Sequence, residues 1–291
     1  MASRRLITLS SFPGPTLPVR KAFLLAVLLH LSVFSFSQTT DSTRAFSQAV
    51  ESSELNAQAA DSAKAVSHFS GAVSVTNNGI SLVPTFSLGD PAVLFNLSIG
   101  KKRLTFEPDI RFALEGKPWS FLFWWRYKLL RTEKLSINIG AHPALNFRTV
   151  PVVTNGGARD VIETRRFLAG EVSPNYFLSK NVSVGTYYLY SHGIEENRPK
   201  HTHFLTLNGN FSDIRLTDRF FMRATPQFYY LKQDARDGFY FSTAITLARR
   251  NFPLALSAIL NKTIQTEILA SKELVWNVSL VYFFNKQYVD L

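Results

Sequence analysis

Three sets of side chains in this sequence are of types that could do chemistry. The first is the segment HGIEENRPKHTH, residues 192–203, which contains three histidines and two glutamates. On a strand, His201 and His203 would project to the same side, as a two-histidine chelate of Zn²⁺ requires. An H-x-H pattern fixes no third ligand, and solvated residues at the end of a strand explain it equally well. The sequence therefore predicts no metal and no other cofactor.

The second set surrounds His142. Alternation along a strand would place His142 on the same side as Ser136, Asn138 and Asn146. A serine, a histidine and an amide are the parts of some hydrolase sites. Partners on other strands cannot be identified from one sequence, and a polar histidine that lines an interior is the simpler interpretation. No catalytic residue is predicted, and an enzyme is less favoured than a non-enzymatic protein.

The third set consists of charged residues at alternate positions. In RLTFEPDIRFAL, residues 103–114, one side is apolar throughout, whereas the other side carries charges. Such strict alternation indicates a strand, because successive side chains of a strand point to opposite faces. The polar side of this strand and its successors contains Glu107, Asp109, Arg111, Arg126, Lys128, His142, Arg148, Glu163, Arg165, Glu171 and Arg223.

Twelve such strands are predicted from Ile80 to the end of the chain, each of about ten residues, the length that a tilted strand needs to cross a bilayer. They are ISLVPTFSL, AVLFNLSIG, RLTFEPDIRFAL, SFLFWWRYKLL, LSINIGAHPALNF, RRFLAGEVSPNYFL, VSVGTYYLYS, FLTLNGNFS, RFFMRATPQFYY, FYFSTAITLA, LALSAILNK and ELVWNVSLVYFF. The phase of the seventh is ambiguous, because three tyrosines crowd it. No segment after residue 68 has a convincing helical period.

The predicted connections alternate between long and short. Residues 150–161, 191–202 and 263–273 form long ones, and 179–181 is an example of the short ones. Outer-membrane barrels have this asymmetry, with short periplasmic turns and longer external loops. A soluble sandwich with Greek-key connections has no reason to keep it.

Five prolines do not fit ordinary strands. Pro84, Pro108, Pro143, Pro174 and Pro226 all fall within predicted strands, on the apolar side. Proline cannot donate to a strand ladder, and a closed barrel has no free edge on which to place it. We expect bulges or bends at these positions.

The N-terminus has the order of a secretion signal. Arg20 and Lys21 precede the apolar run of residues 22–34, and small residues then suggest cleavage before Gln38. This order favours secretion over a mitochondrial presequence. We expect a signal peptide over 1–37, a flexible periplasmic leader over 38–67 and a barrel over 68–291. The leader is rich in Ser, Ala and Gln.

Composition narrows the function classes. The chain has no cysteine, which excludes disulfides, cysteine-ligated zinc and a lipoprotein anchor. Removal of residues 1–37 deletes four basic residues and no acidic one, so the formal charge falls from +11 to +7. The remaining basic residues form no cluster or motif, so nucleic acid is not a predicted partner. Abundant aromatic residues with nearly neutral mean hydropathy suit strands that have one apolar face.

These features predict an all-β fold: a single transmembrane, antiparallel, up-and-down barrel of about 12 strands, rather than a soluble β protein. In a bilayer the apolar face would contact lipid and the charged face would line the lumen. Around the hairpin at EGKPW, the pairing of inward residues predicts Glu107 opposite Arg126 and Asp109 opposite Trp124. A shift of two residues is compatible with the unknown geometry of the loop.

The chain resembles a bacterial outer-membrane β-barrel of the small porin-like kind found in Bacteroidota, over about residues 70–291. The resemblance rests on the signal, the aromatic strands, the loop asymmetry and the final strand LVWNVSLVYFF, although NKQYVDL follows that strand. It implies location in the outer membrane, contact with its lipid and with the barrel-assembly machinery, and a passive channel for small solutes. A closed structural or adhesin-type barrel is the alternative, and an outer-membrane hydrolase ranks third.

Overall fold

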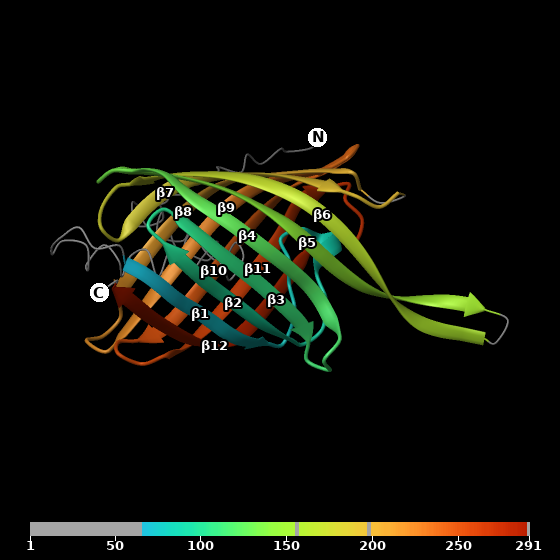
Figure 1. Cartoon of the computed structure of the whole chain (residues 1–291), viewed down its shortest axis with the longest axis horizontal. Helices are drawn as coiled ribbons and strands as arrows, with labels where there is room; N and C mark the ends of the chain where they lie inside the picture. The colour runs from blue at the N-terminus through green and yellow to red at the C-terminus, as the bar shows by residue number, and fades with distance from the viewer. Residues whose placement is uncertain (1–65, 155–156, 197–198, 290–291) are drawn as a thin grey trace, which may run out of the picture. The chain divides into compact units, whose positions relative to one another are not determined.

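The computed structural model describes residues 66–154, 157–196 and 199–289, which form one closed antiparallel β-barrel of twelve strands (Figure 1). The predicted fold class is confirmed. The strands are β1 (Val66–Thr76), β2 (Ala92–Lys101), β3 (Leu104–Ala113), β4 (Pro118–Arg131), β5 (Leu135–Thr154), β6 (Gly157–Phe177), β7 (Val182–Gly193), β8 (His201–Arg215), β9 (Phe220–Gln233), β10 (Arg236–Arg249), β11 (Leu254–Thr266) and β12 (Leu274–Val289). Over the same described ranges, no helix has the length and apolar character needed to cross a membrane.

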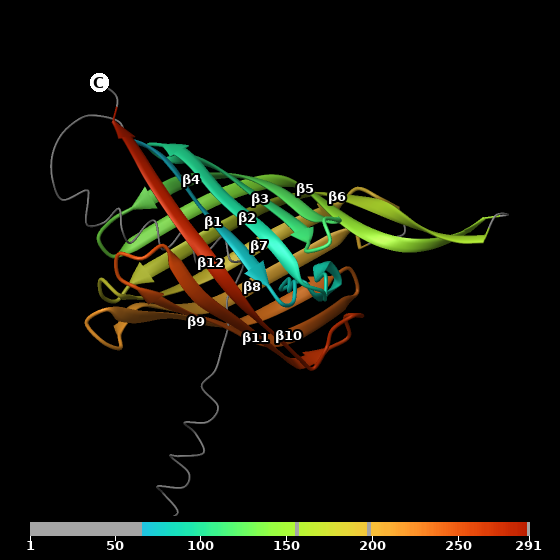
Figure 2. The same cartoon turned by 90° about the horizontal axis from the view of Figure 1, so that it is seen from below.

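The barrel closes through its first and last strands. β1 pairs with β12 from Val66↔Val289 to Thr76↔Ser279, and on its other side it pairs with β2 (Figure 2). Every other strand pairs with its neighbours in the chain. Closure leaves no free sheet edge, so the backbone donors and acceptors are satisfied between strands, as a lipid environment requires.

The two ends of the barrel differ in their connections. The turn end carries 102–103, 132–134, 178–181, 216–219 and 250–253, whereas the loop end carries 77–91, 114–117, 155–156, 194–200, 234–235 and 267–273. The longest connections, 77–91, 194–200 and 267–273, all lie at the loop end. The predicted alternation was nevertheless too regular, since 155–156 and 234–235 are as short as any turn.

The predicted loop 150–161 is for the most part strand. β5 and β6 continue their ladder past Val150↔Val161 to Thr154↔Gly157, and this hairpin projects beyond the rest of the barrel (Figure 1). β-branched residues such as Val152 and Val161 favour the extended backbone. Gly157 has φ +107°, a conformation suited to a tight hairpin turn.

The first predicted strand, ISLVPTFSL, is wrong. The first strand of the barrel is β1, and it begins at Val66, within the expected leader; the rest of that leader and the expected signal peptide lie outside the described residues. Residues 80–88 belong instead to the β1–β2 connection, where Pro84–Phe86 forms a 3-10 turn (η1). Pro84 suits the first position of such a turn, because its missing N–H would have no partner there. The number of strands was right because one false strand replaced one missed strand.

The other four strand prolines coincide with gaps in the strand pairing. Pro108 is paired with Phe123 of β4, whereas the register with β2 passes from Asn96↔Asp109 to Ile99↔Phe106 and skips it. The registers skip Pro143 on the β4 side, Pro174 on the β7 side and Pro226 on the β8 side. Pro108, Pro143 and Pro174 thus keep a Cα partner on one side and lack one on the other, as suits a residue without an N–H.

The strands separate an apolar outside from a mixed inside. On β8, for example, Leu205 and Leu207 are exposed on the outer face, whereas Thr202, Phe204 and Thr206 are buried on the inner one. On β7, Tyr187 points inward while Tyr188 lies on the outer face, which resolves the ambiguous phase of that strand. An apolar exterior around a partly polar interior is the reverse of a soluble sandwich.

Candidate functional site in the barrel lumen

The charged positions of the sequence belong to the inward phase of their strands. On β3, Glu107, Asp109 and Arg111 are all buried, whereas Phe106 and Pro108 between them are not. The other predicted residues, Arg126 and Lys128 of β4, His142 and Arg148 of β5, Glu163, Arg165 and Glu171 of β6 and Arg223 of β9, share the parity of the buried side chains on their strands. The structure sorts these residues into separate groups.

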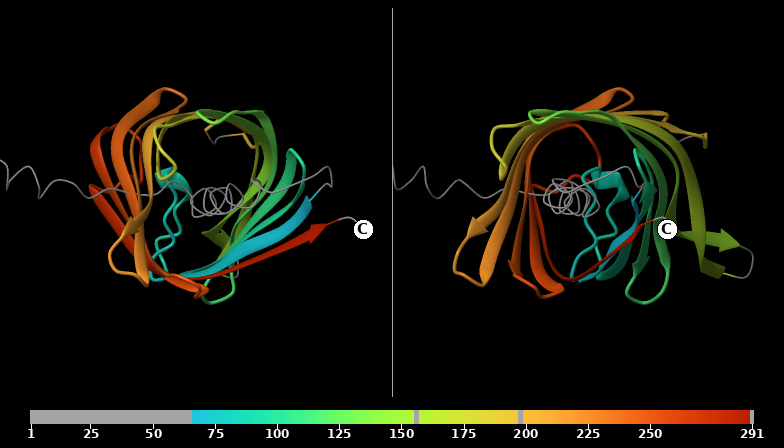
Figure 3. Two further views of the ribbon diagram at one scale, coloured as in Figure 1. Left: turned by 90° about the vertical axis from the view of Figure 1, so that its left-hand side faces the viewer. Right: turned by 60° about the vertical axis from the view of Figure 1, so that its left-hand side comes forward.

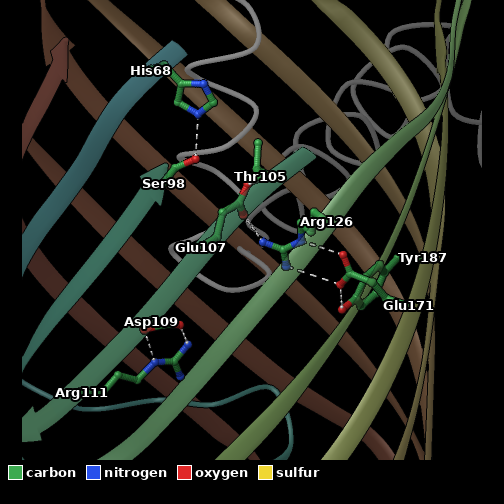
Figure 4. A network of polar contacts seen from close by, with 9 residues as sticks. All are labelled: His68, Ser98, Thr105, Glu107, Asp109, Arg111, Arg126, Glu171 and Tyr187. Atoms are coloured by element: carbon green, nitrogen blue, oxygen red, sulfur yellow. Dashed lines mark hydrogen bonds and ion pairs between the residues drawn. The ribbon is translucent and has the colours of Figure 1, made fainter. Parts of the chain in front are cut away.

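The first group is an ion-pair network centred on Arg126 (Figure 4). Its Nη1 donates to Glu107 Oε2 on β3, and its Nε donates to Glu171 Oε1 on β6 at 2.7 Å. Tyr187 of β7 donates to Glu171 Oε2 at 2.7 Å, and Thr105 donates to Glu107 Oε1 at 3.0 Å. The side chains of Arg126, Glu107 and Glu171 are only 15%, 6% and 3% exposed. Four strands are therefore joined through buried, charge-assisted hydrogen bonds.

A glycine makes this network possible. Gly140 of β5 is the Cα partner of both Arg126 and Glu171, so it lies between the two charged residues. A Cβ at Gly140 would lie 2.9 Å from Glu171 Oε1 and 3.1 Å from Arg126 Cγ. The absence of a side chain on β5 is what allows the guanidinium and the carboxylate to meet across it.

The hairpin register differs by two from the direct pairing that was predicted. Arg126 is the Cα partner of Thr105, and Trp124 is the partner of Glu107. The sequence left open an offset of two residues from the predicted pairing, and that offset is the one observed. The pairing is irregular between Arg111 and Phe112, next to the turn. Glu107 still reaches Arg126, along the diagonal of the pair.

Asp109 and Arg111 form a second pair. Arg111 Nε donates to Asp109 Oδ1 at 2.9 Å, and both side chains lie on the inner face of β3 two residues apart. The Arg111 guanidinium also lies 5.2 Å from the centre of the Trp119 ring, within cation–π range. The two charges are thus compensated within one strand.

A third group lies at the loop end, where β5 and β6 begin to project. Arg148 and Glu163 are Cα partners, and Arg165 Nε donates to Glu163 Oε1 at 3.2 Å. Arg148 donates to the backbone oxygen of Thr85 in the β1–β2 connection. Arg165 also lines a pocket of about 440 Å³, together with Thr85, Gln233 and Arg236. Lys128 and Arg223 are half-buried and lie toward the turn end of β4 and β9.

The β1–β2 connection, residues 77–91, lies inside the ring of strands, and we call it the inner segment (Figure 3). Its neck is closed by backbone hydrogen bonds from Gly79 to Asp90 O at 2.8 Å and from Leu88 to Gly79 O at 2.9 Å. Ser87 Oγ accepts from Ser81 N at 2.8 Å and donates to Ser81 O at 3.0 Å. A compact loop that bonds to itself needs no strand ladder to hold its shape.

Side chains of the barrel wall hold the inner segment in place. Trp119 Nε1 donates to Phe86 O at 2.7 Å, Tyr229 OH donates to Leu82 O at 3.2 Å, and Gln233 Nε2 donates to Thr85 Oγ1 at 3.2 Å. Phe86 packs edge-on against Phe167, with ring centroids 4.9 Å apart. These anchors lie on β4, β6 and β9, so the segment spans the lumen.

Apolar packing adds to these hydrogen bonds. Leu82 and Val83 pack against a buried cluster formed by Tyr187, Phe204, Tyr229, Leu231, Tyr240 and Ile268. Tyr229 and Tyr240 stack with ring centroids 4.7 Å apart and an interplanar angle of 9°. Sequence reasoning missed this use of residues 80–88, because their alternating apolar residues also fit a strand. Gly79, Pro84 and Gly89 are the signals that could have identified a loop.

A cavity of about 120 Å³ lies between the inner segment and the wall formed by β4 to β8. Its apolar lining includes Leu82, Val83, Phe86, Leu122, Phe167 and Phe204, and its polar lining includes Arg111, Ser120, Trp124, Arg126, His142 and Asn146. His142 stacks on Trp124 with ring centroids 3.8 Å apart. The lining thus combines apolar side chains with polar ones, and most of the polar ones are on β4 and β5.

The hydrolase arrangement around His142 does not form along β5. Ser136 and His142 are six residues apart on one strand, about 20 Å at the rise of an antiparallel strand, which is far beyond hydrogen-bond reach. His142 Nδ1 lies 3.3 Å from Pro143 O. These contacts assign His142 to the wall of the cavity.

The histidines of residues 192–203 lie toward the loop end of β7 and β8, where the His192 and His201 rings are 5.3 Å apart. His201 Nδ1 lies 2.8 Å from Tyr190 OH, and His203 Nδ1 lies 2.9 Å from Tyr188 OH. Glu195 accepts from Arg166 Nε at 2.7 Å. Burial raises the pKa of Glu195, but the hydrogen bonds from Arg166 outweigh it, so this pKa is lowered overall. Among the described residues, no group of three histidine or acidic side chains could hold a metal ion.

No profile of a known protein family matches the chain. No curated protein matches it in sequence. Solved structures that are similar include the KdgM porin in complex with disordered oligogalacturonate, with a TM-score of 0.45 and 9% identity over 75% of this chain and 99% of that one. The NanC porin has a TM-score of 0.42 and 10% identity over 76% of this chain and 100% of that one. A loop L8 deletion mutant of OmpT, an outer-membrane protein of Vibrio cholerae, has a TM-score of 0.40 and 9% identity over 77% and 100%. At these scores the likenesses carry no weight for function, which rests on the chain's own strands and side chains.

Proposed function

We propose that this chain is an outer-membrane β-barrel that lets small solutes cross, and that the inner segment narrows its lumen. The proposal rests on one observation. The barrel is closed and apolar on the outside, and its lumen holds a loop, the inner segment. The inner segment leaves a pocket of about 440 Å³ at the loop end and a cavity of about 120 Å³ beside the wall. Both spaces suit small molecules.

The outer surface supports a membrane location. Large apolar side chains are exposed over most strands, among them Leu207, Phe228, Leu256 and Leu280. In water such a surface would drive association, whereas in a bilayer it meets the hydrocarbon. Tyrosines flank it: Tyr190 and Tyr230 lie toward the loop end, and Tyr127, Tyr176 and Tyr282 lie toward the turn end. Aromatic girdles of this kind sit at the two membrane interfaces.

We infer that the aromatic final strand β12 is recognised by the barrel-assembly machinery.

A closed structural barrel is the second candidate, and one observation favours it. The Arg126 network and the Tyr229–Tyr240 cluster fill part of the interior, so side chains as well as the inner segment narrow the lumen. The two candidates differ in whether removal of the inner segment is enough to open a path.

Single-channel recording in planar bilayers tests the proposal. The variant replaces residues 80–88 by a short Gly/Ser linker, which keeps the strands and removes the anchors to Trp119 and Tyr229. We expect small current steps for the wild type and steps several times larger for the variant. A matched control deletes 151–153 and 158–160, three successive pairs of the projecting hairpin, and should conduct like the wild type. If neither the wild type nor the 80–88 variant conducts, the barrel is closed and structural.

A further inference from the structure

We propose that the cavity beside the inner segment is a binding site for a small, uncharged, amphipathic molecule that has a compact apolar body and one hydroxyl group. The site lies in the lumen of the proposed channel, so the inference deepens that function by naming the class of solute. Its evidence is independent of conduction. It rests on three buried polar atoms, on the charge balance of the wall and on the size of the cavity.

Three buried polar side chains point to a missing partner. Ser120 Oγ, Trp124 Nε1 and Asn146 Oδ1 are shielded from solvent and find no hydrogen-bond partner within the part of the chain that the structure describes. Their residues are 6%, 2% and 4% exposed, and all three line the cavity. A buried polar atom without a partner is costly, so such atoms normally bond to water or to a ligand.

The three residues are neighbours on the wall. Ser120 and Asn146 are direct Cα partners of β4 and β5, and Trp124 is on the same face of β4 as Ser120. An indole N–H can only donate, an amide oxygen can only accept, and a serine hydroxyl can do either. A ligand group that both donates and accepts therefore fits Ser120 and Asn146, as a hydroxyl group does, and Trp124 Nε1 is a further donor on the same wall.

The charges of the wall argue against an ionic ligand. The Arg126 guanidinium is bonded to two carboxylates, and Arg111 is bonded to Asp109. Neither cation offers an uncompensated charge to an anion, and the acidic groups that could attract a cation are engaged by the same arginines. A charged ligand would have to leave water without gaining a counter-ion of its own, whereas a neutral one would not.

The remaining lining sets the body of the ligand. Besides the polar atoms, the cavity is lined by Leu82, Val83 and Phe86 of the inner segment and by Phe167 and Phe204 of the wall. Its volume of about 120 Å³ compares with the ~150 Å³ apolar cavity that holds benzene in an engineered protein. A single ring, or a branched alkyl group of that size, with one hydroxyl meets both halves of the lining. Phenol is the probe of this class.

Isothermal titration of the folded protein in detergent tests the site, with phenol as titrant and protein-free micelles as the blank. We expect one phenol per barrel. Ala144 is buried on the inward face of β5 and lines the cavity, so Ala144→Phe fills the space and should weaken phenol binding at least tenfold. Ala141 lies on the same strand but faces outward and is exposed, so Ala141→Phe is the matched control and should bind like the wild type.

A second variant and further titrants test the polar half without adding bulk. Ser120→Ala should weaken phenol about fivefold and leave toluene unchanged, because it removes one hydrogen bond. Benzoate and benzylammonium should bind at least tenfold more weakly than phenol. Absence of one-to-one phenol binding to the wild type would mean that the cavity holds water only and would overturn the proposal. Equal binding by the Ala144→Phe and Ala141→Phe variants, or benzoate as tight as phenol, would overturn it too. None of these outcomes depends on conductance, so the site and the channel can fail separately.

Discussion

At the scale of single residues, Arg126 and Gly140 have the largest consequences. Arg126 binds the carboxylates of Glu107 and Glu171, which lie on strands on either side of β4. Gly140 has no side chain, and this leaves room for the contact between Arg126 and Glu171. Buried ion pairs of this kind add little net stability over apolar packing, but loss of one partner leaves uncompensated charge. The network therefore fixes the arrangement of β3 to β7 more than it stabilises the barrel.

The variant Arg126→Ala tests this view. It leaves Glu107 and Glu171 without their shared cation, so we expect a loss of about 3 kcal/mol in the free energy of unfolding. The triple variant Arg126→Met/Glu107→Gln/Glu171→Gln should recover most of that loss. Denaturant titration in detergent, followed by circular dichroism, measures both. Arg215→Ala, which removes an exposed pair with Asp218 at the turn end, is the control and should cost less than ~1 kcal/mol. Equal losses for Arg126→Ala and Arg215→Ala would contradict a buried network.

Gly140→Ala is predicted to be destabilising for a different reason. The added Cβ would fall 2.9 Å from Glu171 Oε1, and that carboxylate is held by Arg126 and Tyr187 and has little freedom to move. We expect a loss of about 1–3 kcal/mol on the same titration, as for other overpacked sites. Gly170 lies one register pair away, and a Cβ there would meet nothing nearer than Gly140 O at 3.8 Å. Gly170→Ala should therefore be tolerated, and an equal effect of the two changes would refute the steric explanation.

At the scale of elements, the inner segment and the projecting β5–β6 hairpin are the departures from a plain barrel. The first brings the β1–β2 connection into the lumen, and the second carries the ladder past the loop end. Both belong to the loop end, where the longest connections lie. In outer-membrane barrels that end faces the outside of the cell.

Orientation can be tested with epitope tags on whole cells. Tags inserted within 150–161, 191–202 and 263–273 should bind antibody without permeabilisation, because these segments belong to the loop end. A tag within 179–181, at the turn end, should bind antibody only after permeabilisation. The opposite pattern would place the loop end in the periplasm.

At the scale of the whole molecule, the barrel is an apolar surface wrapped around a polar and aromatic interior. Closure through β1 and β12 satisfies the backbone, and the exposed side chains of the outer face then meet lipid. The inner segment spans part of the interior, and the Arg126 network lies along one side of its wall.

Leu207→Arg tests the lipid-facing surface. Leu207 lies near the middle of β8 and is exposed on the outer face, so an arginine there should cost about 2–4 kcal/mol of folding free energy in a bilayer. Equilibrium folding into lipid vesicles in urea measures the cost. Leu216→Arg, in the exposed turn 216–219, is the matched control and should cost little. If the two variants fold equally well into vesicles, the outer face does not contact hydrocarbon.

Most of the barrel could be predicted from the pattern of side chains. Side-chain alternation has a period of two whatever the partner strands are, so it revealed the strands, the apolar face and the set of charged positions on the other face. Glu107, Asp109 and Arg111 could be assigned to one face from their spacing alone. The alternation could not tell a strand from a loop whose apolar residues pack inside a barrel, and residues 80–88 were misassigned for that reason.

Only the tertiary structure decided which of those residues meet. Cross-strand contacts depend on register, and register depends on turn geometry that a single sequence does not specify. The pairing of Glu107 with Arg126 along a diagonal, the role of Gly140 and the pairing of Ser120 with Asn146 all follow from register. The inner segment depends on contacts with Trp119, more than thirty residues away, and with Tyr229, nearly one hundred and fifty residues away. Local spacing carries no information about contacts at such separations, because they exist only once the barrel has closed.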